Sequence, residues 1–217
     1  MDLSQYQMTE SGGNGIQFLK NKKTGHRLVL KRCNLEKGLK EVRAYQKMER
    51  SALVDFSIEP QGVLLLMHRH HGLSLSEYLE SDRLIDRLIE QFDRLLFSSM
   101  QALRHIHLEG IVHGRLTPNK LIIDDDFGVQ IVGFSDSEPV GVQPEVFEPD
   151  GFTAPELVFR VDADPKLADY YSLGRCLRLV IRGREQAVSF ESLEMVMALS
   201  SAIPATRSEA IRGRLDS

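Results

Sequence analysis

The spacing of apolar residues changes partway along the chain, and this change limits the folds that the chain can adopt. Residues 14–33 alternate in strand fashion around a turn at residues 21–25, which predicts a β-hairpin. Residues 36–50 show the helical rhythm of one buried face. Residues 52–67 read as two short strands broken at Glu59-Pro60-Gln61-Gly62. The first part is therefore β-rich, with one helix.

Helical periodicity dominates the rest of the chain. Residues 84–108 form the longest periodic segment, which predicts one long helix. Two short strands, 120–124 and 129–132, flank an acidic turn, and a loop rich in Pro and Glu follows over residues 135–155. A helix over about 166–182 and one or two short helices come last. A small β-rich part followed by a mostly helical part predicts an α+β fold.

The composition excludes several classes of protein. The 217 residues are 42% hydrophobic and 27% charged, as in ordinary globular proteins. The net charge of −4 provides no basic field for nucleic acid. No window approaches the roughly 18 apolar residues of a membrane span. Cys33 and Cys176 lack metal-site spacing and favour a reducing compartment. We therefore expect a cytoplasmic protein, although secretion without a cleaved signal would leave no trace in the sequence.

Motifs in the first part resemble those of protein kinases. Leu28-Val29-Leu30-Lys31 resembles the V-A-I-K strand, whose lysine contacts the phosphates of the nucleotide. Glu41 resembles the helical glutamate that pairs with that lysine, and Glu36 and Glu49 are weaker candidates for the same role. The segment from Met67 to His71 lies where the hinge between the two lobes of such a kinase is expected.

The second part carries more specific motifs of the same family. His113-Gly114-Arg115 with Lys120 resembles the catalytic loop H-R-D-x-x-x-x-N. Ala154-Pro155-Glu156 resembles the A-P-E motif that ends the activation segment. The segment beginning at Asp169 resembles D-x-W-S-x-G, the start of a buried helix whose Asp anchors the catalytic loop. Ile203-Pro204-x-x-Arg207 resembles D-P-x-x-R, so we predict an ion pair between Glu156 and Arg207.

This resemblance implies a single two-lobed domain over residues 1–217. The N-lobe would cover about residues 1–68, the hinge about 68–72 and the C-lobe about 73–217. The C-lobe is shorter than usual and resembles the compact kinases of bacteria and their secreted effectors. His113 and Phe134, with Tyr45, are expected to form the apolar stack that links the lobes in kinases.

The residues that perform phosphoryl transfer in this family are replaced. Arg115 stands at the position of the catalytic Asp, and Lys120 at that of the metal-binding Asn. The string Asp126-Phe127-Gly128 follows Lys120 by only six residues and has the composition of a turn, so we assign the metal-binding motif to Gly133-Phe134-Ser135 instead. Asp→Arg adds two charges, Asn→Lys one and Asp→Gly one, a change of about +4. Arg115 cannot act as a base, because its pKa exceeds about 12.

A cationic cleft could still bind an anion. Lys31, Arg115 and Lys120 could neutralise phosphates directly, so ATP or ADP without magnesium is the candidate ligand. In the alternative, Lys31 pairs with Glu41, and the other two cations pair with acidic neighbours or point to solvent. A clean G-x-G-x-x-G spacing is missing from the glycine-rich residues 11–15, which predict a turn. The residues expected to contact a nucleotide are Lys31, Glu41, Val29, Met67, His68, Ile122 and Lys120.

We therefore expect a pseudokinase that binds a protein partner, such as an active kinase, a kinase substrate or a regulatory protein. The alternative is an atypical phosphotransferase that recruits other metal ligands, with Asp136 as a candidate, or that modifies a non-protein substrate. A third reading is a structural module with an unfilled cleft. The acidic loop 136–155 could fold back over the cationic cleft. The histidines of residues 68–71 are adjacent in an extended segment, so we predict no metal site there.

Overall fold

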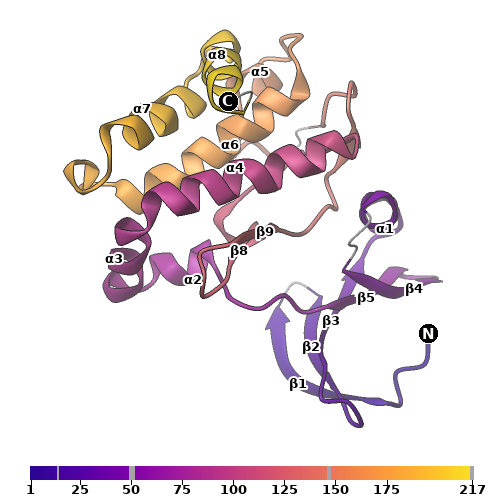
Figure 1. Ribbon diagram of the computed structural model, residues 1–217. Helices are drawn as coiled ribbons and strands as arrows, with labels where there is room; N and C mark the ends of the chain where they lie inside the picture. The colour runs from indigo at the N-terminus through magenta and orange to yellow at the C-terminus, as the bar shows by residue number, and fades with distance from the viewer. Residues whose placement is uncertain (14, 49–51, 146–147, 216–217) are drawn as a thin grey trace. The chain divides into compact units, whose positions relative to one another are not determined.

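The computed structural model describes residues 1–13, 15–48, 52–145 and 148–215. The chain divides into two compact units. Unit 1 comprises Met1–His70 and Gly133–Ser137, and unit 2 comprises His71–Val132 and Glu138–Ser217. Unit 1 is β-rich and unit 2 is mostly helical, which confirms the predicted α+β class and the predicted order of the two parts (Figure 1).

Unit 1 is built on a five-stranded antiparallel sheet. The predicted hairpin is present, with Phe18 opposite Val29 and the amide of Gly25 donating to the carbonyl of Asn21 at 3.0 Å. The predicted break at residues 59–62 is the turn between the two following strands. In sheet order β1-β2-β3-β5-β4, the strands are β1 (Tyr6–Gly13), β2 (Ile16–Asn21), β3 (Arg27–Cys33), β5 (Gly62–His68) and β4 (Leu53–Glu59).

Strand β1 is the element of this sheet that the sequence did not predict. Ser11, Gly12 and Gly13, expected to form a turn, belong to β1 and pair with β2. Asn14, in the same glycine-rich segment, lies outside the described residues. Most of β1 is exposed. Because neither face of the strand is buried, its sequence does not show the alternation of apolar and polar residues that would predict a strand. Backbone hydrogen bonds to β2, rather than burial, define the strand.

The core of unit 1 lies around β5. Residues Gly62 to Met67 are all buried. A strand that is exposed on one face shows alternating apolar and polar residues, whereas a strand buried on both faces, such as β5, shows a continuous apolar run. One cluster of buried side chains joins three neighbouring strands and consists of Leu19, Leu28, Leu30, Leu64 and Leu66.

Helix α1 (Leu35–Lys47) packs against this sheet. Asn34 caps it by accepting a hydrogen bond from the amide of Lys37 at 2.9 Å, so the helix begins one residue before the predicted start. Residues 49–51, around its predicted end, lie outside the described residues. A Cβ built on Gly38 would lie only 2.4 Å from the Cβ of Val63, so glycine permits the close approach of α1 to β5.

Unit 2 is a set of packed helices with three short strand pairings. Helix α6 packs against α3, α4, α7 and α8, and α4 and α6 show in Figure 1 as neighbouring helices. No helix in the described ranges is both long and apolar enough to cross a membrane. The helices are α2 (Leu75–Leu79), α3 (Asp82–Glu90), α4 (Phe92–Leu108), η1 (Pro118–Lys120), α5 (Pro155–Val158), α6 (Pro165–Ile181), η2 (Glu185–Ala187), α7 (Phe190–Leu199) and α8 (Pro204–Leu215). The strands are β6 (Leu73–Ser74), β7 (Ile111–Val112), β8 (Leu121–Ile123), β9 (Val129–Ile131) and β10 (Glu138–Pro139).

The long helix predicted over residues 84–108 is wrong in one respect, because the chain breaks at Gln91. This residue has φ −116° and ψ 24°, which separates α3 from α4. Buried Leu88 and Phe92 continue the apolar pattern across the break. No glycine or proline marks the position, so local sequence carried no signal for it.

The predicted ion pair between Glu156 and Arg207 is present. The guanidinium of Arg207 donates to the carboxylate of Glu156 and to the carbonyl of Ser201, and both charged side chains are almost fully buried. Burial lowers the pKa of Arg207, while the Glu156 carboxylate opposes that change. This contact joins α5 to α8 across 51 residues of sequence.

The substitution Arg207→Met should lower the free energy of unfolding by about 3–5 kcal/mol, because it leaves a buried unpaired carboxylate. Urea denaturation followed by circular dichroism measures this loss. Removing both charges in Arg207→Met/Glu156→Leu should recover most of it.

The matched control is Arg32→Met, since Arg32 makes a 2.6 Å ion pair with Glu59 at the surface, with 45% and 31% of the two side chains exposed. We expect this control substitution to lower the free energy of unfolding by less than about 1 kcal/mol. Equal losses for the buried and the exposed pair would contradict the assigned role of Arg207.

Candidate functional site

The loop that resembles a catalytic loop is held by one buried carboxylate. Asp169, on α6, accepts hydrogen bonds from the backbone amides of His113 at 2.7 Å and Gly114 at 2.9 Å. Nε2 of His107, on α4, lies 2.9 Å from the same carboxylate. Gly114 has φ 79°, a left-handed conformation that glycine adopts without strain. Asp169 thus fixes the loop backbone at His113 and Gly114.

Arg115 and Lys120 both have partners within unit 2. Nε of Arg115 lies 3.8 Å from a carboxylate oxygen of Asp150, and both side chains are partly exposed. Nζ of Lys120 donates to the carbonyl oxygen of Arg115 at 2.8 Å. Lys120 therefore braces the loop. Asp150 belongs to the acidic loop 136–155, so one part of that loop lies beside Arg115.

The string Asp126-Phe127-Gly128 forms the turn between β8 and β9, as predicted. One carboxylate oxygen of Asp124 accepts from the amides of Asp126 at 3.0 Å and Gly128 at 2.8 Å. Phe127 has φ 60°, and Asp126 is exposed. These contacts are those of a tight turn stabilised by its own Asp side chain.

The segment assigned instead to the metal-binding motif belongs to unit 1. Gly133 has φ 81°, and Phe134 is fully buried with its ring centroid 5.2 Å from that of Tyr45, edge to face. Phe134 thus packs against α1 as expected. A carboxylate oxygen of Asp136 lies 3.1 Å from Nζ of Lys37. This contact was not predicted, and it occupies the one carboxylate that the sequence offered as a substitute metal ligand.

Lys31 and Glu41 form the expected ion pair, with 2.6 Å between Nζ and a carboxylate oxygen. Glu41 is fully buried, and its other oxygen has no hydrogen-bond partner among the described residues. Burial, together with the charge of Glu41 and against that of Lys31, raises the pKa of the nearby Cys33 thiol to about 11. The weaker candidate Glu36 pairs with Lys40 instead, and Glu49 lies outside the described residues.

The other residues predicted to contact a nucleotide are divided between the two units. Half-buried Val29 on β3 is the register partner of buried Met67 on β5, so these two lie together in unit 1. His68 is the exposed last residue of β5, at the boundary predicted between the N-lobe and the hinge. Ile122 is half-buried on β8 in unit 2.

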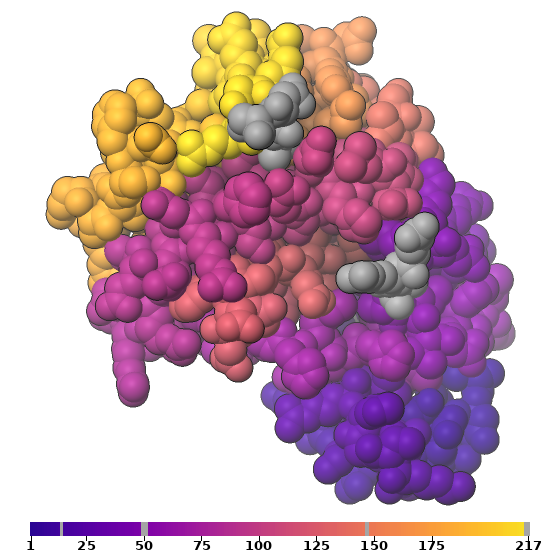
Figure 2. Space-filling model, viewed as in Figure 1, coloured from indigo at the N-terminus to yellow at the C-terminus, as the bar shows by residue number. Residues whose placement is uncertain are grey.

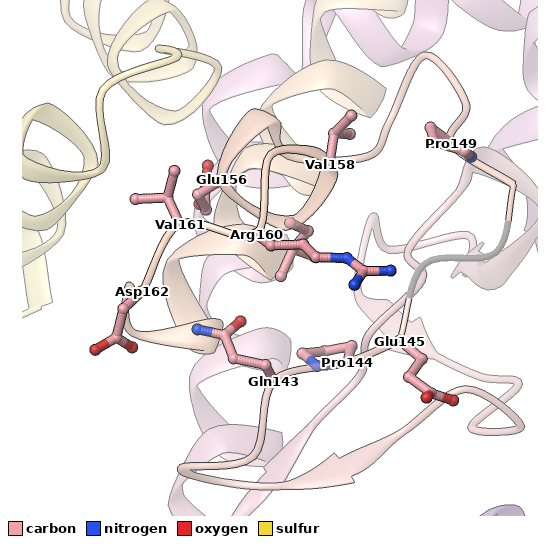
Figure 3. A pocket seen from close by; sticks show the side chains of 10 residues that line it. Gln143, Pro144, Glu145, Pro149, Glu156, Val158, Arg160, Val161 and Asp162 are labelled. Atoms are coloured by element: carbon pink, nitrogen blue, oxygen red, sulfur yellow. The ribbon is translucent and has the colours of Figure 1, made fainter.

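Unit 2 also holds a cavity of about 530 Å³ (Figure 3). Residues 143–145 and 149 line one side, and residues 156–158 and 160–162 line the other. The guanidinium of Arg160 points toward Glu145 and Pro149. Two apolar residues that line the cavity are exposed, Val158 at 40% and Val161 at 55%. Large apolar side chains grouped at the surface of a soluble protein are typical of sites that contact other proteins.

Comparison with known proteins finds protein kinases. A sperm motility kinase described as a Tcr mutant form, from Mus musculus, is 26% identical over 83% of this chain and 40% of its own length. Mitogen-activated protein kinase 12 from Danio rerio is 20% identical over 93% of the chain and 59% of its own length. Cyclin-dependent kinase 7 from Carassius auratus is 23% identical over 79% and 51%.

No protein-family model matches the chain. The chain spans about half the length of the curated relatives it matches. Similarity to several kinases over most of the chain agrees with the β-rich unit followed by a helical one. The chain is therefore similar to protein kinases over most of its length, and this similarity supports its place in the protein kinase superfamily.

Proposed function

We propose that this protein is a pseudokinase, which binds a protein partner and does not transfer phosphate. The observation that carries the proposal is the loop 113–120. Its backbone is anchored by Asp169, yet Arg115 and Lys120 stand where the catalytic Asp and the metal-binding Asn are expected. The partner would be an active kinase, a kinase substrate or a regulatory protein.

The chemistry of phosphoryl transfer supports this reading. The reaction needs an acceptor that orients the attacking hydroxyl, and oxygen ligands for magnesium. Arg115 offers neither, because a guanidinium has only donors and stays protonated. Asp126 is engaged in a turn by its backbone, and Asp136 is paired with Lys37. The Asp136 carboxylate, the substitute metal ligand that the sequence offered, is thus committed to Lys37.

A bound nucleotide without magnesium remains part of the proposal. Lys31 keeps its contact with Glu41, the arrangement in which kinases present this lysine to phosphates. Arg115 is partly exposed, and its contact with Asp150 is long enough for a stronger anion to displace it. Each of these cations therefore offers a contact to the phosphates of ATP or ADP.

Binding of a protein has its own support in unit 2. The exposed Val158 and Val161, which line the cavity of Figure 3, provide an apolar surface. Cys33 and Cys176 are both free, which suits a partner met in the reducing cytoplasm.

If the cationic site binds ATP, saturating ATP should raise the melting temperature equally with magnesium and with EDTA. At 100 times the dissociation constant, a ligand stabilises by about 2.7 kcal/mol, which a thermal-shift assay detects readily. Arg115→Ala should reduce the shift. Arg32→Ala is the matched control, since Arg32 has nearly the same exposure, 45% against 43%, and pairs with Glu59.

A shift that requires magnesium would favour the atypical phosphotransferase instead. The absence of any shift up to millimolar ATP would remove the nucleotide from the proposal and leave a protein-binding module.

Phosphate transfer from radiolabelled ATP, to the protein itself or to a general protein substrate, should stay at the level of the Lys31→Ala variant. That variant removes the phosphate-contacting lysine and sets the background. Incorporation that exceeds this background, and disappears with Lys31→Ala, would overturn the assignment as a pseudokinase.

A further inference from the structure

Helices α7 and α8 enclose an open groove of about 830 Å³ on unit 2. Figure 2 shows these helices at the surface, in orange-yellow and yellow. From α7 the groove is lined by Phe190, Leu193, Glu194 and Met197, and from α8 by Thr206, Glu209, Ala210 and Arg214. It is separate from loop 113–120 in its residues, and nothing in the proposed pseudokinase function uses it.

Helix α7 is apolar on two of its sides. Met195, Val196 and Leu199 are buried, and Gly174 of α6 lies so near Leu199 that a Cβ there would come within 2.8 Å of its Cβ. On the groove side, Phe190 is 72% exposed and Met197 is 48% exposed. A helix that carries apolar side chains on more than one face is usually packed against other elements on each of these faces. Here the side facing α6 is covered and the groove side is open.

The groove side of α7 has the spacing that a docked helix requires. Phe190, Leu193 and Met197 follow at i, i+3 and i+7, so they form one stripe along the helix. Across the groove, Thr206 and Ala210 are small side chains one turn apart on α8, which leaves room for a third helix. Methionine adapts its shape to different partners.

The rim of the groove is acidic. Arg214 is the one cation among its lining residues, and it lies 3.7 Å from Glu191. Glu194 on α7 and Glu209 on α8 are exposed, and no ion pair involves them within the described residues. Two uncompensated carboxylates, one on each side of an apolar floor, favour an occupant that carries positive charge at its edges.

We propose that this groove binds an amphipathic helix of a partner protein, with an apolar stripe flanked by Lys or Arg. An isologous contact with a second copy would bring the same carboxylates together, which is unfavourable. An anionic membrane surface would be repelled for the same reason. A helix laid in a groove buries its apolar stripe and places its basic residues beside Glu194 and Glu209.

The probe is a fluorescent 16-residue peptide with leucines on one helical face and lysines beside them. Its twin carries glutamates in place of the lysines, and a scrambled peptide keeps the composition without the stripe. Fluorescence anisotropy should show that the lysine peptide binds at least about tenfold more tightly than either comparison peptide. Its affinity should fall as salt rises, because screening weakens the rim contacts.

Two variants locate the site. Met197→Lys should lower the affinity for the lysine peptide by about tenfold, because an apolar contact is lost and the new lysine repels those of the peptide. Glu194→Lys/Glu209→Lys should make the glutamate peptide the tighter ligand. The control Met8→Lys/Glu90→Lys changes residues of the same types, exposed outside the groove, and should leave the affinities unchanged. Circular dichroism checks that each variant is folded.

The proposal is overturned if the scrambled peptide binds as tightly as the lysine peptide, or if the groove variants behave as the control does. It is also overturned if sedimentation shows a dimer of the unmodified protein that Met197→Lys dissociates, because a second copy would then be the occupant.

Discussion

The buried carboxylate of Asp169 is the contact on which the functional part of unit 2 depends. It brings α6, α4 and the loop 113–120 to one point through the amides of His113 and Gly114 and the ring of His107. A buried carboxylate needs hydrogen-bond donors. Removing one of them lowers the stability by more than the net contribution of one hydrogen bond, because the carboxylate oxygen is left buried and unsatisfied. The loop geometry is therefore secured at His113 and Gly114 by Asp169, and the Lys120 ammonium adds a contact to the carbonyl of Arg115.

Each of the three cations expected in the site has a partner within its own unit. Lys120 turns its ammonium to the carbonyl of Arg115, and Arg115 lies beside Asp150. Lys31 keeps Glu41, whose second oxygen is buried without a partner among the described residues. Lys31 and Arg115 differ in how readily they can bind an added anion. Lys31 is tied to a buried charge, whereas Arg115 has a long contact at the surface that exchanges more easily.

The features that the sequence predicted correctly are those whose signal is local or is repeated in a motif. The hairpin around residues 21–25, the turn at Asp124 and the Glu156–Arg207 pair are of this kind. The break at Gln91 was missed because the apolar pattern runs through it, and β1 because its side chains are exposed. The pairing of Lys37 with Asp136 joins residues far apart in sequence, and no local pattern encodes such a contact. His107 could have been found, since a histidine shortly before the loop 113–120 is visible in the sequence.

The pair of Glu156 and Arg207 also bears on the order in which unit 2 can form during synthesis. Glu156 meets its partner 51 residues later, and both side chains are almost without access to water. Until Arg207 has left the ribosome, α5 cannot be buried without stranding a carboxylate in an apolar setting. The α5 region should therefore stay open on the nascent chain, while α4 and α6 can already pack against each other. Completion of unit 2 would then follow the synthesis of α8, which acts as its closing element.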